Sequence, residues 1–344
     1  MRASMPMVDF GIAGLGSCLG EPCDVLRDAH RYGVEPELVA RMGFRTYHKA
    51  PAGVTTSMLA ATAGRTALER AGVDASQVDY LVVASASMPE YFSWDPSTAV
   101  ARELGMRGVR TLLLTQTCTS GVLAFQYIAG LFATRDDVRT VLLICPERVS
   151  EEQHGRMGSG TTADSDGAAA AVLRRGHRSL RWLATEQLTD AEYTDFYRLE
   201  YGGSAAPFPP EGRSNHDIDP AELIYRTFQG DPERFISYAQ MTDARLAEVV
   251  DSACGRAGVK RAELSKLLLL NANQEAMQGM ARALDVPLDR TNAELAARLG
   301  HFGSADPLVC LDICREHGEL KSGERIALAG VCAGLHWFCT VLEV

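Results

Sequence analysis

The sequence contains no run of about 18 apolar residues, the length at which a hydrophobic helix spans a bilayer. It also has no excess of positive charge, because 44 acidic residues outnumber 34 basic ones and give a formal net charge of -10. Nucleic acids and anionic membrane surfaces are bound by clustered Lys and Arg, so neither is expected as a partner. Residues 1–14 hold one arginine and no long apolar core, so we expect no signal peptide and a soluble cytoplasmic protein.

Cysteines in metal-ligand pairs are also lacking. The nine cysteines are odd in number and scattered, and only Cys310 and Cys314, four residues apart in PLVCLDICREHG, resemble a ligand pair. That stretch has the pattern of an amphipathic helix, and no second pair sits at ligand spacing, so core packing is the better interpretation. We therefore predict reduced thiols and no metal.

Alternating apolar runs and helical patterns indicate an α/β protein. The chain has 344 residues, 46% of them hydrophobic and 23% charged, which suffices for a full globular core. In the first part we expect strands at 10–16, 78–87, 109–117, 138–147 and 166–173, and helices at 55–72, 95–105 and 120–134. Later we expect helices at 245–258, 275–286 and 307–318, and strands at 265–274, 325–334 and 336–344.

The second part of the chain repeats the plan of the first. VDYLVVASASM and LSKLLLLNANQEAM resemble one element seen twice, which predicts duplicated halves at 1–174 and 175–344. Two such halves would bring the corners at Cys118 and His301 together at one central site. The segment 194–220 is rich in Pro, Gly, Ser and Asn, and is either a surface connection or a lid that walls an acceptor pocket.

Cys118 lies in TLLLTQTCTSGVLAF, at the end of an apolar strand and just before a helix. A helix N-terminus lowers the pKa of a nearby thiol, and the thiolate is the nucleophilic form. Ser120 and Gly121 are small enough to let a substrate approach. These local features indicate a nucleophile, although a buried structural cysteine is the alternative.

Several blocks resemble the ketoacyl synthase III family of the thiolase superfamily. GIAGLG resembles its first strand, RMGFRTYHKA its GIR segment, SDGAAAAVL its GDGAGAAVL hairpin and AGLHWFCTVLEV its terminal strands, in the same order along the whole chain. The resemblance implies a thiolase-like fold of two duplicated α/β halves in α-β-α-β-α layers, and a homodimer. It also implies an acyl-CoA or acyl-phosphopantetheine donor without a tightly bound cofactor, and makes Cys118 the acyl acceptor.

Two side chains of the family site have exchanged places in this sequence. Condensing members resemble one another in a His-Gln-Ala-Asn block and a Gly-Asn-Thr-Ser block, whereas this chain reads NANQ and GHFGSAD. Asn271 therefore stands where His is expected, and His301 stands where Asn is expected. The family's second backbone donor to the oxyanion corresponds to Ala333, in the turn CAG.

Asp306 follows His301 by five residues. A carboxylate on one ring nitrogen fixes the imidazole tautomer and makes the other nitrogen a better base. With Cys118 this predicts a Cys–His–Asp set, in which the thiol attacks an acyl thioester and His301 deprotonates an incoming hydroxyl or thiol. Alternatively Asp306, followed by Pro307, serves only as a helix N-cap.

This pattern resembles a branch of the family that moves acyl groups without forming a carbon–carbon bond, such as the malonyltransferase of cervimycin biosynthesis. It implies transfer of a short acyl or aryl-acyl group to a hydroxyl, such as the sugar of a natural product, or to the thiol of an acyl carrier protein. Two alternatives are a decarboxylative condensing enzyme, with Asn271 and His301 as donors, and a catalytically reduced interaction subunit.

Two peripheral groups of residues complete the predicted site. At the positions where the resemblance implies contacts with CoA, this sequence carries other residues. Arg41 and Arg45 are then either the remaining contacts for the anionic groups of the donor or members of surface salt bridges. Tyr91, Phe92 and Trp94 lie on a loop that in the family reaches the partner subunit, so they either close a neighbour's pocket or pack locally.

Overall fold

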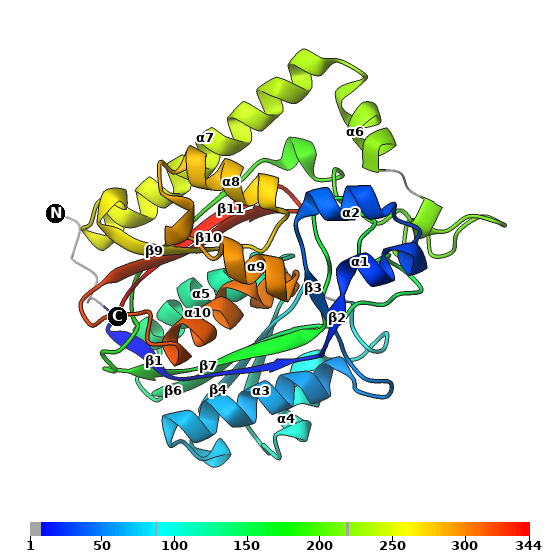
Figure 1. Ribbon diagram of the computed structural model, residues 1–344. Helices are drawn as coiled ribbons and strands as arrows, with labels where there is room; N and C mark the ends of the chain where they lie inside the picture. Colours follow the sequence, from blue (N-terminus) through cyan, green and yellow to red (C-terminus); the bar gives the residue numbers. More distant parts are fainter. Residues whose placement is uncertain (1–7, 87, 218–219) are drawn as a thin grey trace.

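The computed structural model describes residues 8–344 except residue 87 and residues 218–219. Its centre is a nine-stranded mixed sheet in the order β5-β4-β6-β7-β1-β8-β11-β10-β9 (Figure 1). The strands are β1 (Phe10–Leu19), β4 (Tyr80–Ala84), β5 (Arg110–Leu114), β6 (Thr140–Glu147), β7 (Gly167–Arg175), β8 (Arg181–Thr189), β9 (Leu264–Leu269), β10 (Arg325–Cys332) and β11 (His336–Glu343). In a separate two-stranded antiparallel sheet, β2 (Glu21–Asp24) pairs with β3 (Thr46–Lys49).

Strand pairing shows the duplication directly. In the first half β4 runs parallel to β6, β6 antiparallel to β7, and β7 antiparallel to β1. In the second half β9, β10, β11 and β8 repeat these pairings in the same sequence. A single residue pair, Gly11 with Arg181, connects the two sets of strands. The predicted fold of two duplicated halves is thus confirmed, whereas a boundary at 174/175 stays a prediction.

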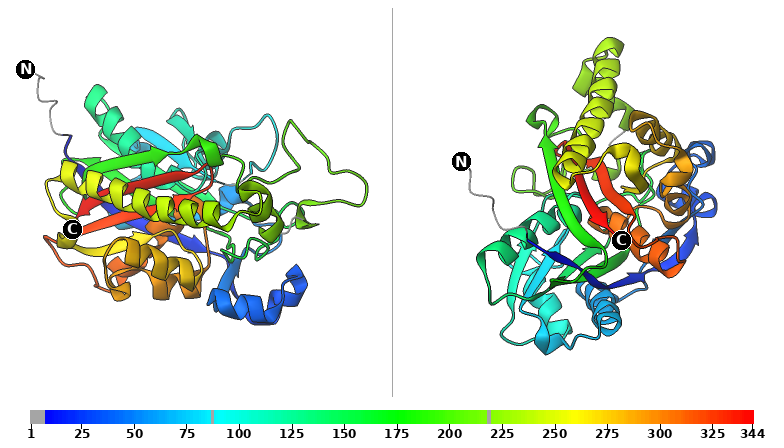
Figure 2. Two further views of the ribbon diagram at one scale, coloured as in Figure 1. Left: turned by 90° about the horizontal axis from the view of Figure 1, so that it is seen from above. Right: turned by 90° about the vertical axis from the view of Figure 1, so that its left-hand side faces the viewer.

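The helices complete five layers. They are α1 (Val25–Asp28), α2 (Pro36–Met42), α3 (Thr56–Ala71), α4 (Pro96–Glu103), α5 (Ser120–Thr134), α6 (Pro220–Phe228), α7 (Pro232–Ala257), α8 (Gln274–Ala283), α9 (Ala293–Leu299) and α10 (Asp306–Glu316). Helices α5 and α10 lie between the two sets of strands, α3 and α4 cover the outer face of the first, and α7 and α8 cover the second (Figures 1 and 2). α5 is apolar on nearly all sides, as a helix covered by strands on both sides requires.

The elements predicted from apolar runs are present, and α5 has the predicted bounds. The helix predicted at 245–258 is the last part of α7, which begins at Pro232 after its N-cap Asp231. Strands β2, β3 and β8 and helices α1, α2, α6 and α9 were not predicted, because their sequences are short or lack a long apolar stripe. Across the described residues, no helix combines the length and the apolarity needed to cross a bilayer.

Candidate active site

Cys118 sits in a tight turn between β5 and α5. Thr117 has a φ of 50°, in the left-handed region that non-glycine residues seldom adopt. The turn is held by Ser120, whose Oγ accepts from the Gln116 N–H at 2.7 Å and donates to the Thr117 carbonyl at 2.8 Å. The Thr117 hydroxyl donates to the Ala333 carbonyl at 3.0 Å, which ties the cysteine turn to the second half.

His301 faces Cys118 from the turn after α9. The His301 N–H donates to the Ala163 carbonyl, and the Ser165 N–H donates to the His301 carbonyl, both at 2.8 Å. Gly121 lets the first turn of α5 approach the turn beyond His301, because a Cβ at position 121 would lie 2.3 Å from the Ser304 carbonyl oxygen. The two predicted corners therefore meet, with Cys118 Sγ 3.4 Å from His301 Nε2.

Asp306 lies on the other side of the imidazole. Its Oδ2 is 2.5 Å from His301 Nδ1, and its oxygens also accept from the backbone N–H groups of Phe302 at 2.6 Å and Asn271 at 2.8 Å. The residue is fully buried. It is the first residue of α10, whose N-cap is Ala305, and its side chain turns back to the preceding loop. The alternative that Asp306 is only a helix cap is therefore wrong.

The protonation of the site follows from these contacts. Burial alone would lower the pKa of His301, but the Asp306 carboxylate, aided by Asp164 and Glu147, raises that pKa to about 9. A hydrogen bond with the Cys332 thiol, together with burial, raises the pKa of Cys118. The pKa of Cys118 is therefore not lowered as we expected from the helix N-terminus, because the contact with Cys332 and burial both raise it. Activation of Cys118 therefore depends on a base.

The side-chain amide of Asn271 is hydrogen-bonded outside the cavity at Cys118, and its predicted role as an oxyanion donor stays a prediction. Its Nδ2 donates to the Gly300 carbonyl at 2.6 Å, its Oδ1 accepts from Asn292 at 2.8 Å, and it is not among the described residues that line the cavity at Cys118. Its amide holds the loop that carries His301. Ala333 does line that cavity, so a donor role for its backbone N–H stays a prediction.

The cavity at Cys118 has a volume of about 290 Å³. Besides Cys118, His301 and Ala333 it is lined by Ala86, Met88, Thr117, Glu147, Arg148, Val149, Ser150, Gln153, His154, Asp164, Tyr197, Leu199 and Gly303. Tyr197 and Leu199 belong to the segment 194–220, so this segment forms part of the wall. Its action as a lid stays a prediction.

A second histidine–carboxylate pair lines the same cavity. His154 Nε2 lies 2.6 Å from Asp164 Oδ2. Burial alone would lower the pKa of His154, but Asp164 raises it. Neither residue was predicted, because both lie in an irregular loop whose spacing matches no motif.

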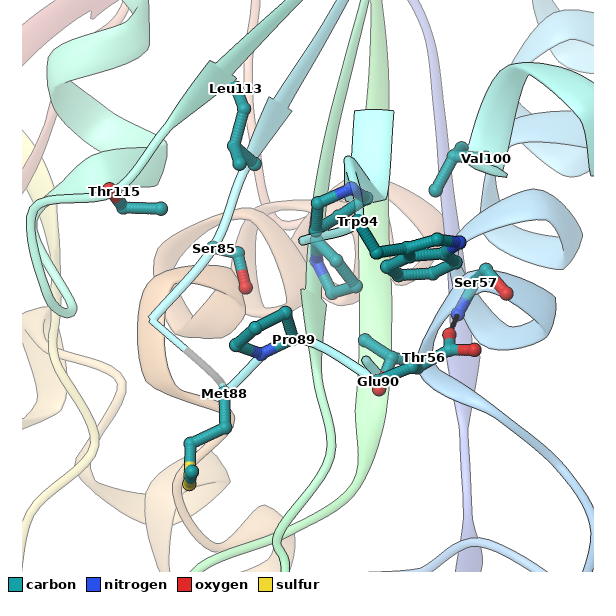
Figure 3. Close-up of a pocket in the computed structure, with 12 residues that line it drawn as sticks. Thr56, Ser57, Ser85, Met88, Pro89, Glu90, Trp94, Val100, Leu113 and Thr115 are labelled. Atoms are coloured by element: carbon teal, nitrogen blue, oxygen red, sulfur yellow. Dashed lines mark hydrogen bonds between the residues drawn. The ribbon is translucent and has the colours of Figure 1, made fainter. Parts of the chain in front are cut away.

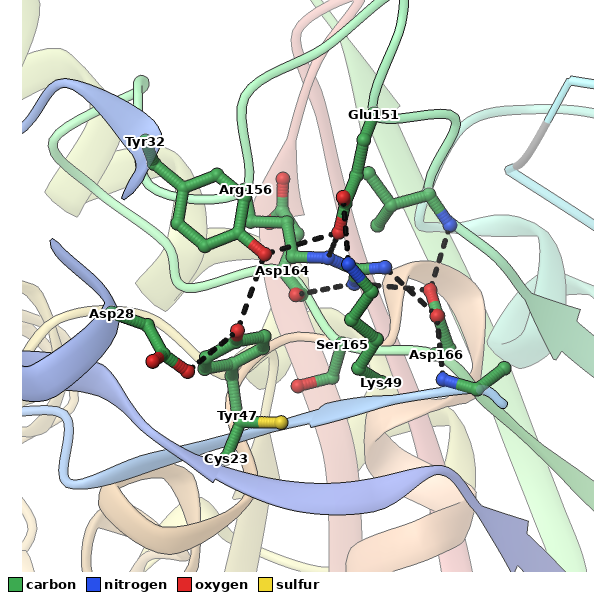
Figure 4. A network of polar contacts seen from close by, with 12 residues as sticks. Cys23, Asp28, Tyr32, Tyr47, Lys49, Glu151, Arg156, Asp164, Ser165 and Asp166 are labelled. Atoms are coloured by element: carbon green, nitrogen blue, oxygen red, sulfur yellow. Dashed lines mark hydrogen bonds and ion pairs between the residues drawn. The ribbon is translucent and has the colours of Figure 1, made fainter. Parts of the chain in front are cut away.

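A buried arginine anchors the loop that carries this pair (Figure 4). Arg156, only 2% exposed, bonds both oxygens of Asp166 at 3.0 and 2.8 Å, the Asp164 carbonyl at 3.0 Å, and Glu151 at 2.5 Å. Asp166 also accepts from the backbone N–H of Ala50 at 2.8 Å. The loop beside His301 is thereby fixed without help from His154.

The peripheral residues lie elsewhere. Arg41 is exposed and Arg45 pairs with Glu294, and neither is among the described residues that line the cavity. The donor contacts predicted for them stay predictions.

Trp94 lines a separate cavity of about 140 Å³ with Met88 and Glu90 (Figure 3). Tyr91 packs edge-on against Trp94 with ring centroids 5.6 Å apart, and Phe92 is 83% exposed. The contacts support local packing for Trp94, and closure of a partner's pocket stays a prediction.

Comparison with known proteins places the chain in a family. Residues 254–344 match the family model of the 3-oxoacyl-[acyl-carrier-protein (ACP)] synthase III C terminal, and residues 39–163 match the thiolase N-terminal domain. The β-ketoacyl-[acyl-carrier-protein] synthase III of Bordetella petrii is 31% identical over 307 residues, covering 87% of this chain and 85% of that protein. The chain belongs to the ketoacyl synthase III family. The enzyme of the same name from Acaryochloris marina is 26% identical, covering 89% of this chain and 88% of that protein.

Solved structures agree with this ketoacyl synthase III fold. ChlB3, described as an acyltransferase, superposes with a TM-score of 0.84 and 22% identity, covering 98% of each chain. The 3-oxoacyl-(acyl carrier protein) synthase III of Pseudomonas aeruginosa superposes with a TM-score of 0.79 and 23% identity, covering 97% of this chain and 98% of that one. At these identities the likeness shows the thiolase-like fold, and the family itself consists of transferases.

Proposed function

We propose that this ketoacyl synthase III family member is an acyltransferase that does not condense. It carries a short acyl or aryl-acyl group on Cys118 and hands it to a hydroxyl or a carrier thiol. The observation that supports this most is the continuous contact from Cys118 Sγ to His301 Nε2, and from His301 Nδ1 to Asp306. The donor is a thioester of CoA or of an acyl carrier protein.

In the first half-reaction, neutral His301 takes the proton of the Cys118 thiol. The sulfur attacks the thioester carbonyl, and the oxyanion forms beside the backbone N–H groups of Cys118 and Ala333. When the intermediate collapses, the carbon–sulfur bond to the donor breaks and His301 returns the proton to the leaving thiolate. An acyl-Cys118 and a free donor thiol result.

In the second half-reaction the same base acts on the acceptor. His301, neutral again, removes the proton of the acceptor hydroxyl or thiol as its heteroatom attacks acyl-Cys118. Asp306 stabilises the imidazolium formed in this step and keeps Nε2 aimed at the reacting atoms. The proton then passes to the Cys118 sulfur as the acyl group leaves.

Decarboxylative condensation is the second candidate, because the 31% identical relative is a β-ketoacyl synthase. Condensing members use two side chains that donate to the thioester carbonyl. Here the amide of Asn271 is engaged by Gly300 and Asn292, away from the cavity. His301 is coupled to a carboxylate, which favours its use as a base.

Exposure to a panel of acyl thioesters, followed by intact-mass measurement, tests the proposal. We expect one acyl adduct, lost in Cys118→Ala and retained in Cys332→Ala, which removes the neighbouring thiol. An adduct that survives Cys118→Ala, or a wild-type protein that no thioester acylates, would contradict the proposed nucleophile. The latter result would also support the reading as an interaction subunit.

A further inference from the structure

The pair His154–Asp164 lies beside the reacting atoms. Asp164 and His301 are partners in a parallel β-bridge, so their side chains leave the backbone on the same face. Both line the cavity at Cys118, and His154 reaches it from the loop after β6. The Asp164 carboxylate therefore bonds one imidazole and interacts electrostatically with a second, in the cavity that also holds Cys118.

The pair is not needed to hold its own loop. Arg156 already binds the Asp164 carbonyl together with Asp166 and Glu151. Oδ1 of Asp164 is buried and accepts no hydrogen bond at normal geometry from the described residues. The hydroxyl of Thr162, which is close enough to help lower the pKa of Asp164, lies 2.9 Å from Ser159 Oγ. An unsatisfied buried carboxylate oxygen destabilises the folded protein, and a bound donor group that reached it would offset that cost.

The hydrogen-bonding groups of His154 and Asp164 limit the kind of acceptor that the pair can bind. Against the effect of burial, Asp164 raises the pKa of His154 and so favours its protonated form, in which the ring donates an N–H while Asp164 offers a carboxylate acceptor. A hydroxyl both accepts and donates, so it matches such a pair. A carrier thiol is a weak hydrogen-bonding partner and would leave both groups unsatisfied. The other titratable groups that line the cavity are Cys118, Glu147, Arg148, Tyr197 and His301, so acidic and basic groups are balanced and no strong anion site results.

We propose that His154 and Asp164 form an acceptor subsite that binds a second hydroxyl next to the one that is acylated. The acceptor is then a vicinal diol or polyol rather than a carrier thiol. This inference rests on the proposed acyl transfer. In that reaction His301 deprotonates the attacking hydroxyl while the pair holds its neighbour, and the pair itself neither gains nor loses a proton.

The test separates acylation from transfer. The wild-type protein is acylated with the thioester that gives the largest adduct, and the decay of acyl-Cys118 is followed by mass against methyl glucopyranoside, propan-1-ol or N-acetylcysteamine. We expect the glycoside to discharge the enzyme fastest. His154→Gln should raise the glycoside concentration that gives half-maximal rate about ten- to a hundredfold, as for a lost hydrogen bond to a charged group. The maximal rate should change much less.

The control is His317→Gln, which alters an exposed histidine after α10 and should leave the concentration dependence unchanged. If N-acetylcysteamine discharges the wild type faster than the glycoside, or if folded His154→Gln keeps the wild-type dependence, the subsite is refuted. If no adduct forms, the proposed function fails first. Saturation-transfer NMR then still decides the subsite, because it compares glycoside binding by Cys118→Ala with binding by the double variant Cys118→Ala/His154→Gln. Binding by the single variant alone supports the subsite. Equal binding by both proteins, or binding by neither, refutes it.

Discussion

Replacing Asp306 with asparagine removes the charge that sets the acid–base behaviour of the site. A pKa of about 9 for His301, against an ordinary value of 6.5, corresponds to roughly 3 kcal/mol of preferential stabilisation of the imidazolium. Both side chains are shielded from solvent, with His301 only 14% exposed and Asp306 fully buried, so little of this stabilisation is lost to screening. Because burial opposes protonation, we expect the pKa of His301 in Asp306→Asn to fall to about 6.5 or below.

The effect on the reaction has two parts. The wild-type rate of transfer from acyl-Cys118 should rise with pH and level off above about 9, as His301 becomes neutral. In Asp306→Asn the rise should move to lower pH by about 2.5 pH units or more. The plateau rate should fall by roughly ten- to ten-thousand-fold, because the tautomer and orientation of the base are lost.

The assay is single-turnover decay of acyl-Cys118 across pH 5.5 to 10, followed by intact mass. Glu316→Gln, which neutralises an exposed carboxylate near the other end of α10, is the matched control and should leave the profile unchanged. A folded Asp306→Asn protein with the wild-type profile and a rate within about twofold would refute the role of Asp306 as the partner of the base.

Three further predictions concern packing, the thiol and stability. Gly121→Ala should push α5 away from the facing turn, lower the free energy of unfolding in urea by about 1–3 kcal/mol and slow acyl transfer. The control Gly130→Ala, which adds a Cβ into open space in the same helix, should be neutral or stabilising. Equal effects of the two substitutions would contradict this prediction. Cys332→Ala removes the hydrogen bond that raises the pKa of Cys118. The rate at which iodoacetamide alkylates Cys118 should therefore reach half its maximum at a lower pH than in the wild type. An unchanged midpoint would count against that contact. Because folding raises the pKa of His301, its stabilisation is complete below about pH 6.5 and is lost as pH rises through about 9. Between about pH 6.5 and pH 9 the free energy of unfolding should therefore fall more in the wild type than in His301→Gln, by up to about 3 kcal/mol. Parallel plots of unfolding free energy against pH for the two proteins would contradict this prediction.

The parts of the fold that follow from apolar patterning were predictable. α5 is apolar on nearly all sides and was predicted to the residue, whereas β8 mixes polar and apolar residues at the junction of the halves and was missed. The long N-terminal part of α7 is mostly exposed and therefore carried no periodic signal.

The residues of the candidate site also fall into those that the sequence predicts and those that it does not. Cys118 and His301 stand in blocks that resemble the family, so their meeting could be predicted. The direction in which the Asp306 carboxylate turns depends on the tertiary position of the Phe302 and Asn271 N–H groups, and the helix-cap alternative was open for that reason. His154 and Asp164 lie in an irregular loop that the hydrogen bonds of Arg156 hold in place, and no sequence spacing predicts that two such residues will meet.

The most direct test of the central claim is the fate of carbon dioxide and of the acyl group in one reaction. The enzyme is given carboxyl-labelled malonyl-CoA, a second acyl-CoA and a polyol, and released carbon dioxide is measured together with the masses of Cys118 and the polyol. The proposed function predicts an acyl group that appears first on Cys118 and then on a polyol oxygen, with no carbon dioxide above that of Cys118→Ala. Release of carbon dioxide with formation of a β-ketoacyl product would contradict it.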